Sequence, residues 1–189
     1  MMTVDKKKIE KAIKDILEAI GEDPKRAGIV DTPKRVAEMY SDLLGNVNQN
    51  AAEELTVIHK ETHEEMVIIK DITFHSICEH HLLPFFGKVH VIYIPKKGRI
   101  TGISKINRVI ENLAKRPQIQ ERMTTQIADI MVEKLLPQGV MVIMEAEHLC
   151  MSMRGIKKPG AKVMTSAVRG ILEKNSSTRA EALALINNK

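Results

Sequence analysis

The sequence predicts an α+β protein in which a pair of helices precedes a mixed body of strands and helices. Apolar residues recur at helical spacing in the first part of the chain, whereas short runs rich in β-branched residues begin after about Leu55. The length of 189 residues suits about one domain. We therefore expect an N-terminal helical region over residues 1–54 and a mixed body over residues 55–189, which act as one functional domain.

Two amphipathic stripes predict the helical pair. The first stripe ends at Gly21, a residue that commonly terminates helices. The second helix is expected to begin at Thr32, a good N-cap, with Pro33 in its first turn, and to end at Gly45. The apolar positions of the two stripes are Ile9, Ile13, Ile16, Leu17, Ile20, Val36, Met39, Tyr40, Leu43 and Leu44.

The body is expected to alternate between strands and helices. The three strand runs cover residues 66–74, 88–94 and 140–145. Two helices are expected between the second and third runs, one capped by Ser104 and one that follows Arg116 and Pro117. Thr178 and Glu181 have the spacing of a capping box, which predicts a last short helix.

The composition excludes several classes of protein. Hydrophobic residues make up 43% and charged residues 28%, as in a globular chain and unlike a disordered one. Aromatic residues are only 3%, so an RNA-binding surface of stacked rings is not expected. The net charge of +5 is spread along the chain, which argues against a nucleic-acid partner.

The sequence also bears on location. No run approaches the roughly 18 apolar residues of a membrane span, and the N-terminal stretch has helical periodicity in place of the apolar core of a signal peptide. We therefore expect a cytoplasmic protein without a membrane partner. In a reducing compartment, Cys78 and Cys150 are better suited to metal binding or catalysis than to a disulfide.

Cysteine and histidine cluster at two places in the sequence. Cys78 and His81 lie in a Cys-x-x-His spacing, and Cys150 follows about 70 positions later, so tertiary folding would have to close the site. Thiolate and imidazole are ligands that Zn²⁺ prefers, and three protein ligands leave the fourth position for water, as in catalytic zinc. His80 and His148 are then the acid/base candidates. A structural metal site and ordinary core residues remain alternatives.

A second group of residues suits phosphate and a nucleobase. Lys105 and Arg108 lie three apart near the start of a predicted helix, where the positive helix end favours an anion. Arg154 lies four residues beyond the second cysteine and therefore close to any metal site there. Gln120 and Glu121 add a carboxylate that can pair with the donor edge of a base. A solvated helix face is the alternative for these residues.

Seven short motifs stand out along the chain. They are DTPKRVAEMY (31–40), FHSICEHH (74–81), YIP (93–95), GISKINR (102–108), RPQIQER (116–122), HLCMSMRG (148–155) and TS (165–166). Together and in this order they resemble GTP cyclohydrolase I, and the resemblance spans roughly residues 10–186.

The resemblance implies a reaction. That family converts GTP and water to 7,8-dihydroneopterin triphosphate and formate, the first step of tetrahydrofolate-type pterin synthesis. By position, Cys78, His81 and Cys150 are expected to hold one Zn²⁺ per subunit, with its activated water attacking C8 of the guanine. His148 is expected as a proton donor near the imidazole ring of the base. His80 is expected as the acid/base group at the ribose oxygen.

The resemblance also assigns the substrate contacts. Glu121 is expected to read N1 and the exocyclic amine of guanine, with Gln120 beside it. Ser104 is expected to contact phosphate and to relay protons in the later rearrangement. The cations assigned to the triphosphate are Lys105, Arg108, Arg154 and Arg35.

The fold implied by the resemblance is the T-fold. It consists of an antiparallel four-stranded sheet with two helices on one face, preceded by a helical hairpin. Subunits of the family join their sheets into rings, and two five-membered rings stack into a toroidal homodecamer whose active sites are shared between subunits. The chain departs from the family at Val163, where threonine is more common and where a hydroxyl contact near the site would be weakened, and at Leu172, where phenylalanine is common.

Two other functions compete with this interpretation. One is another T-fold enzyme that acts on pterin or deazapurine substrates. The zinc synthases of that fold use histidine ligands, and its nitrile-reducing members use a cysteine nucleophile without zinc, so the Cys-x-x-His and His-x-Cys pairs argue against both. The other is a zinc-stabilised basic module that binds nucleic acid, which predicts a metal site closed by four ligands and salt-sensitive binding.

Overall fold

The computed structural model of the chain describes residues 4–58 and 63–187. The chain divides into two compact units, Met1–Asn48 and Gln49–Lys189. None of the helices in the described part of the chain has both the length and the apolar character needed to cross a membrane.

The first unit is the predicted helical pair. It consists of α1 (Lys6–Ala19) and α2 (Thr32–Leu43), which pack against each other. The N-cap of α2 is Asp31 and not Thr32, which is the first residue of the helix. The carboxylate of Asp5 caps α1 by accepting a hydrogen bond from the backbone N–H of Lys8 at 3.0 Å. Ala37 is the one residue of the two described helices that is buried, so most of both apolar stripes stays partly exposed within this unit.

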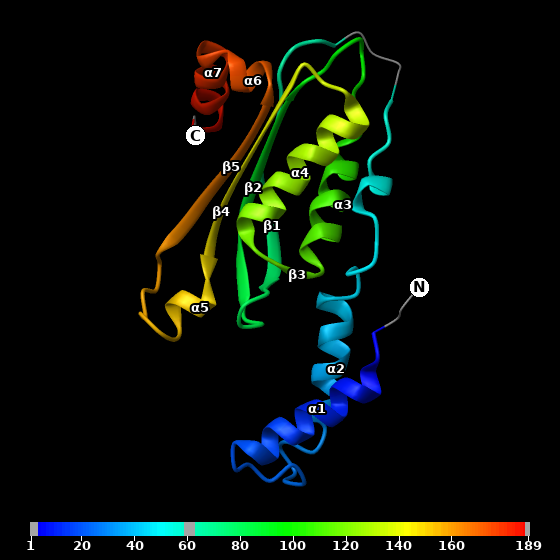
Figure 1. The fold of residues 1–189 in the computed structure, drawn as a ribbon, viewed down its shortest axis with the longest axis vertical. Coiled ribbons are helices and arrows are strands. Elements are labelled where there is room, and N and C mark those ends of the chain that lie inside the picture. Colours follow the sequence, from blue (N-terminus) through cyan, green and yellow to red (C-terminus); the bar gives the residue numbers. More distant parts are fainter. Residues whose placement is uncertain (1–3, 59–62, 188–189) are drawn as a thin grey trace. The chain divides into compact units, whose positions relative to one another are not determined.

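The second unit is built on a mixed five-stranded sheet with the strand order β3-β1-β2-β4-β5 (Figure 1). Its four long strands pair antiparallel, and the two-residue strand β3 pairs parallel to β1. The implied four-stranded, purely antiparallel sheet is therefore not what the structure shows. The elements are η1 (Ala51–Glu54), β1 (Val67–Cys78), β2 (Pro84–Ile94), α3 (Ile103–Ala114), β3 (Pro117–Gln118), α4 (Gln120–Leu135), β4 (Gly139–His148), α5 (Leu149–Ser152), β5 (Lys162–Gly170), α6 (Ile171–Lys174) and α7 (Ser176–Asn187).

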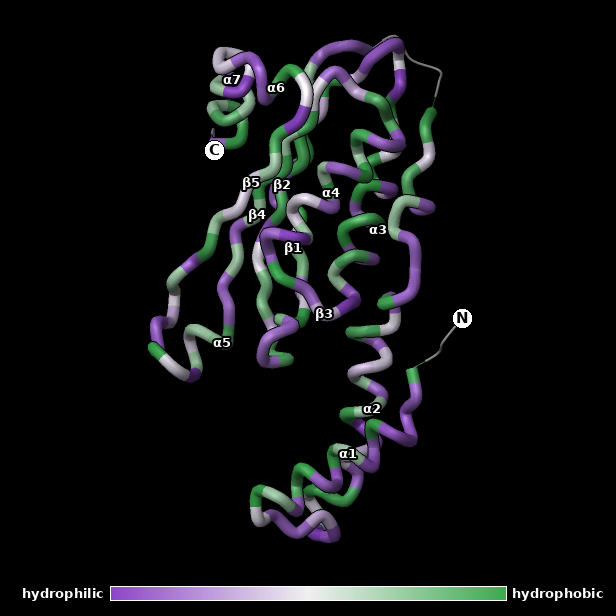
Figure 2. Tube along the Cα trace, in the orientation of Figure 1, coloured by the Kyte–Doolittle hydropathy of each residue, from purple (hydrophilic) through white to green (hydrophobic). Residues whose placement is uncertain are grey.

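The core lies between the sheet and the helices α3 and α4, which cover one face (Figure 1). Along α3 and α4, hydrophobic and hydrophilic stretches alternate, as expected for helices with one buried side (Figure 2). The short helices α6 and α7 lie against the opposite face, where Leu172 and Ala182 pack with Ile92 and Met141. Helices thus contact both faces of the sheet, whereas the resemblance implied only one.

The predicted strands and helices of this unit are confirmed with wider bounds, and three details differ. The N-cap of α3 is Gly102, not Ser104. The last helix begins two residues before Thr178, because the side chain of Asn175 accepts hydrogen bonds from the first turn at 2.9 and 3.0 Å. The elements that the sequence pattern does not predict are η1, β3, α5, β5 and α6.

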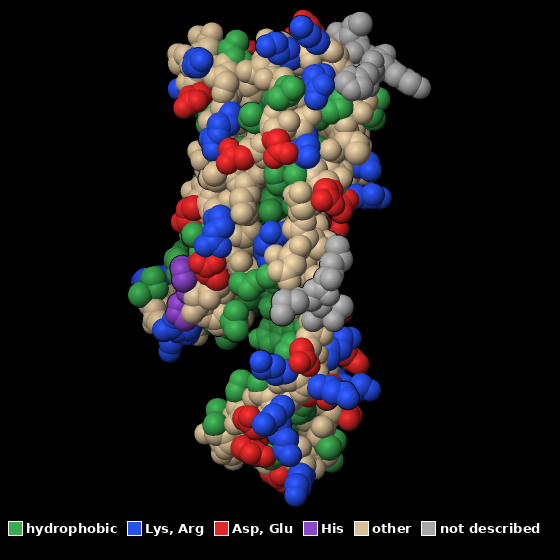
Figure 3. Space-filling view, turned by 45° about the vertical axis from the view of Figure 1, so that its right-hand side comes forward, with side chains coloured by type: hydrophobic (Ala, Val, Ile, Leu, Met, Phe, Trp, Pro, Cys, Tyr) green, Lys and Arg blue, Asp and Glu red, His purple; other side chains and the backbone are tan. Residues whose placement is uncertain are grey.

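The surface of the molecule carries both signs of charge. Figure 3 shows Lys and Arg side chains interspersed with Asp and Glu side chains over one face. Several of these charges pair across the sheet: Lys88 on β2 lies 2.7 Å from Asp71, and Lys162 on β5 lies 2.5 Å from Glu145. Such exposed pairs contribute little to stability, about 0–1 kcal/mol each.

The close approach of β2 and β4 generates a prediction at Gly87. A Cβ atom at this position would overlap the backbone oxygen of Glu145 and lie 2.7 Å from Cα of Ala146. We expect Gly87→Ala to destabilise the sheet by about 3 kcal/mol, because neither backbone can move without breaking the pairing. Thermal unfolding followed by circular dichroism should show a clearly lower midpoint.

The matched control is Gly102→Ala. Its added Cβ would meet only side-chain atoms, at 3.8 and 3.9 Å, which is ordinary contact. Equal midpoints for the two variants would contradict the close pairing of β2 and β4.

Candidate functional site

The turn between β1 and β2 brings Cys78 and His81 to the same side. The backbone N–H of Cys78 donates to the carbonyl of Leu83 at 2.9 Å, and the N–H of Leu82 donates to the carbonyl of Cys78 at 2.9 Å. Leu82 adopts a left-handed conformation with φ 52°, which closes the turn. The Cys-x-x-His spacing therefore places a thiol and an imidazole within one turn.

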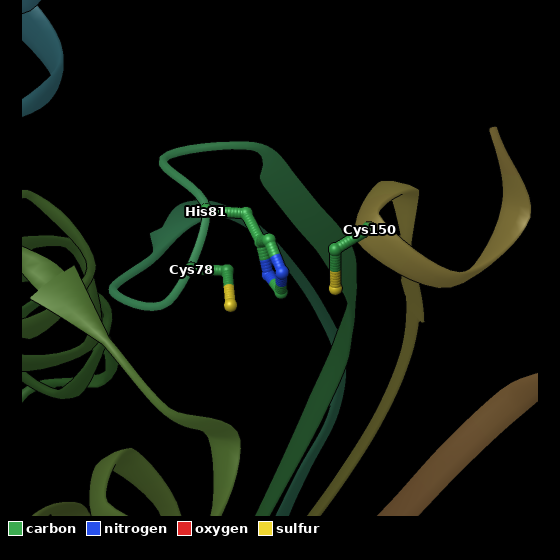
Figure 4. A group of neighbouring side chains, drawn as sticks. All are labelled: Cys78, His81 and Cys150. Atoms are coloured by element: carbon green, nitrogen blue, oxygen red, sulfur yellow. The ribbon is translucent and has the colours of Figure 1, made fainter. Parts of the chain in front are cut away.

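The third member of the cluster arrives from β4. β4 pairs with β2 without interruption and sets His148 opposite Phe85, so that α5 begins beside the β1–β2 turn. The ligand atoms of Cys78, His81 and Cys150 all lie within 4.8 Å of one another. Figure 4 shows the three side chains projecting to the same side, with the imidazole between the two sulfur atoms in this view.

The donor set fits a zinc ion. Both cysteines are free, and Cys78 is only 4% exposed. Burial, and then the neighbouring Cys78, raise the pKa of the Cys150 thiol, so two thiolates at this spacing need a cation between them. Two sulfurs and one imidazole nitrogen are soft and borderline ligands that suit Zn²⁺. Three protein ligands leave one position for water or substrate.

His148 lies next to this cluster in a defined environment. Its ring stacks on Phe85 with centroids 4.7 Å apart and planes 7° apart. Its Nε2 atom lies 2.8 Å from Oε1 of Gln120. Burial lowers the pKa of His148, and the carboxylate of Glu121 opposes this shift in part. The lowered pKa favours the neutral form of the ring.

His80 and Arg154 lie at the edge of the cluster. His80 is exposed, and its Nδ1 atom lies 3.9 Å from the sulfur of Cys78. Nη1 of Arg154 donates a hydrogen bond to Nε2 of His81 at 2.7 Å. Glu121 is exposed in the first turn of α4. The structure thus gathers these predicted residues at the Cys78 end of the sheet.

The predicted phosphate contacts on α3 are not part of this cluster. The hydroxyl of Ser76 donates to the carbonyl of Ala114 at 2.8 Å, so the C-terminal end of α3 lies beside the Cys78 end of β1. From there α3 extends back along the sheet, so its N-terminal turn lies farther from the cluster (Figure 1). At 1.5 Å per residue, Ser104 lies about 15 Å from Ala114 along the helix axis, and Lys105 and Arg108 lie on the same helix.

Arg35 belongs to the first unit. It lies on α2, where its guanidinium pairs with Asp31 at 3.2 Å. Both side chains of this pair are largely exposed to solvent.

Sequence reasoning missed two contributors to the site. Phe85 supports the His148 ring, and nothing distinguishes it from other apolar strand residues in the sequence. Glu79, next to Cys78, binds Arg122 of α4 through two hydrogen bonds of 2.6 and 2.8 Å, and this bond lowers the pKa of Glu79. In the sequence, only the position of Glu79 within the Cys-Glu-His-His run points to this contact with Arg122.

Comparison with known proteins agrees with this geometry. Residues 9–187 match the sequence model of the family GTP cyclohydrolase I. The chain belongs to this family. It is 61% identical over 186 residues to the GTP cyclohydrolase 1 of Carboxydothermus hydrogenoformans, which covers 98% of this chain and 97% of that protein. The enzymes of the same name from Bacillus pumilus and Bacillus subtilis are 57% and 56% identical, and each match covers 100% of both chains.

One solved structure is similar at a much lower level. The archaeosine synthase QueF-Like in its apo form matches 59% of this chain and 96% of its own, with 17% sequence identity and a TM-score of 0.44. That likeness is too weak to bear on the activity. Membership of the family rests on the sequence relatives, which extend over the whole chain.

Proposed function

We propose that this chain hydrolyses GTP to 7,8-dihydroneopterin triphosphate and formate, the first step of tetrahydrofolate-type pterin synthesis. The observation that carries the proposal is the convergence of Cys78, His81 and Cys150 in a member of the GTP cyclohydrolase I family. Opening a guanine ring requires a nucleophile at a carbon atom, proton transfer to nitrogen and a site for the triphosphate. The residues around the cluster would supply the first two, together with one phosphate ligand, Arg154.

Cys78, His81 and Cys150 would hold one zinc ion. When bound, zinc supplies an acidified water, with a pKa of about 7, as the nucleophile for C8 of guanine. Two thiolates and a neutral imidazole balance the two positive charges of the ion. Cys78 is buried against the core, so the site would be fixed on the sheet and not on a mobile segment.

The neighbouring side chains would move protons and hold the base. Half-buried His148 would exchange a proton with the imidazole ring of guanine, and exposed His80 would act at the ribose oxygen. Glu121, exposed beside His148, would accept hydrogen bonds from N1 and the exocyclic amine. Arg154 lies near enough to reach a phosphate once its bond to His81 is exchanged for a ligand.

The remaining phosphate ligands would come from another copy of the chain. Along α3, Ser104 lies about 15 Å, Lys105 about 14 Å and Arg108 about 9 Å from Ala114, which lies beside the Cys78 end of β1. We infer that these residues serve the cluster of a neighbouring subunit. A ring of subunits whose sheets join edge to edge would bring them together, as in the toroidal decamer implied for a T-fold protein of this family, and Arg35 would complete the triphosphate site.

No nucleic-acid or membrane partner is proposed. The Lys and Arg side chains in Figure 3 alternate with Asp and Glu and form no continuous basic stripe on that face. A cytoplasmic location would keep both cysteines reduced and available to zinc.

The first test is turnover with matched variants. The purified zinc-loaded protein should release formate from GTP and form a product with dihydropterin absorbance. Cys150→Ser should lose most of its zinc, measured by elemental analysis, and its turnover with it. His148→Ala should keep zinc but lose at least 100-fold in kcat, in line with a general acid/base role. His75→Ala, on β1 outside the cluster, is the control.

Either of two results would contradict the proposal. One is an assembled, zinc-loaded protein that yields neither formate nor pterin. The other is a Cys150→Ser variant that binds zinc and turns over GTP like the parent.

The second test addresses the sharing of sites between subunits. Lys105→Ala and Cys150→Ser should each be nearly inactive alone. Co-expressed in one cell, they should regain a fraction of activity, because some sites then combine an intact α3 from one chain with an intact cluster from another. Co-expression of His148→Ala with Cys150→Ser is the control, since both changes fall in the same cluster. If mixed oligomers of the first pair form but remain as inactive as the control, shared sites are excluded.

A further inference from the structure

The side chain of Gln120 is hydrogen-bonded at both ends and is only 1% exposed. Its Nε2 atom lies 3.1 Å from the carbonyl oxygen of Met144 and 3.0 Å from that of Val163. The same atom lies 3.1 Å from the hydroxyl of Thr165. At the other end, Oε1 lies 2.8 Å from Nε2 of His148. The two amide hydrogens are shared among these three acceptors, and the buried amide therefore has one orientation.

The partners decide which end of the Gln120 amide is nitrogen. Backbone carbonyl oxygens only accept hydrogen bonds, and two of them face the same amide atom, so this atom must be the nitrogen. The atom that faces His148 is therefore the amide oxygen, which also only accepts. It follows that Nε2 of His148 carries a hydrogen and donates it to Gln120.

Two threonine hydroxyls fix the same direction independently. The hydroxyl of Thr124 donates to the backbone carbonyl of Gln120 at 2.7 Å, which uses its single hydrogen. The hydroxyl of Thr165 lies 2.6 Å from that of Thr124 and must therefore be the donor between them. Thr165 is then left to accept from the Gln120 amide, in agreement with the carbonyl partners. Every donor in this network has an acceptor.

The network includes Val163, one of the two positions at which the chain departs from its family. Val163 contributes its backbone carbonyl to Gln120, and the hydroxyl at this point comes from Thr165. The change from threonine to valine at residue 163 therefore leaves the described contacts of Gln120 intact.

We propose that Gln120 is a positioning residue that accepts the hydrogen on Nε2 of His148 and leaves Nδ1 as its reactive nitrogen. This inference places Gln120 behind His148, in contrast to the expected place of its side chain beside the guanine. The stack on Phe85 fixes the plane of the imidazole, and Gln120 fixes its rotation within that plane. The geometric part stands on its own, and the catalytic part rests on the proposed function.

The consequence for the reaction concerns the order of proton transfers. In the neutral ring, the single hydrogen sits on Nε2 and is held by Gln120. Any proton that His148 gives to a guanine nitrogen would then be one that Nδ1 first takes up, and the attacking water of the proposed reaction would be its source. Nδ1 gains this proton from water and loses it to the base, so His148 is neutral again at the end.

A spectroscopic experiment tests the geometry without reference to turnover. Solid-state NMR of the zinc-loaded protein, labelled with ¹⁵N-histidine and kept at mildly alkaline pH, distinguishes protonated from unprotonated ring nitrogens. The His148 signals are assigned by their loss in His148→Asn. We expect a protonated, hydrogen-bonded Nε2 and an unprotonated Nδ1. In Gln120→Met, the Nε2 proton should move upfield and exchange faster with water.

The matched control is Gln118→Met. Gln118 is also a fully buried glutamine near the start of α4, but its amide donates to Leu113 and Gln126 instead. This variant should leave the His148 signals unchanged. A wild-type His148 that carries its hydrogen on Nδ1, or a Gln120→Met variant with unchanged His148 signals, would overturn the inference.

Kinetics test the catalytic part. Gln120→Met should lower kcat at least tenfold with KM changed less than threefold, because the base is still bound while His148 is misoriented. Thr165→Val should lower kcat severalfold, and Thr165→Ser, which keeps the hydroxyl, should restore it. A change confined to KM would indicate that Gln120 contacts the guanine and would overturn the positioning role. If no protein turns over GTP, the proposed function fails and the NMR result alone decides the inference.

Discussion

The pairing of β2 with β4 is the constraint on which the site depends. Its register runs unbroken from Phe85 opposite His148 to Ile94 opposite Gly139. A slip of one residue would turn the His148 ring to the other face of the sheet and carry Cys150 away from the β1–β2 turn. The stacked ring, the thiol pair and the hydrogen bond from His148 to Gln120 all follow from this single register.

The helices could be predicted from the sequence more completely than the strands. The helices α1 to α4 each bury or present one apolar stripe with helical spacing, which a periodicity argument detects. The sequence pattern does not predict β5, because this strand lies at an edge of the sheet. Most of its side chains are partly buried or exposed, and Ala167 is its single buried residue. The two-residue β3 and the four-residue helices depend on tertiary contacts, which leave no local pattern.

The sequence predicts which residue types form the candidate site but not how they are arranged in space. Cysteine and histidine are typical metal ligands, so the sequence predicts Cys78, His81 and Cys150 as a metal site. Only folding brings the three residues together. The geometry around Gln120 could not be foreseen, because its burial and its carbonyl partners come from β4 and β5. Nor does spacing reveal that Lys105 lies about 14 Å along α3 from the end of the helix that is beside the thiol cluster.

The central claim is that two thiolates and one imidazole bind zinc and leave one position open. X-ray absorption at the zinc edge of the metal-loaded protein tests it most directly. The account predicts two sulfur atoms at about 2.3 Å and two light atoms, the imidazole nitrogen and a water oxygen, at about 2.0–2.1 Å. A shell of four protein donors without water, or a shell without sulfur, would contradict it.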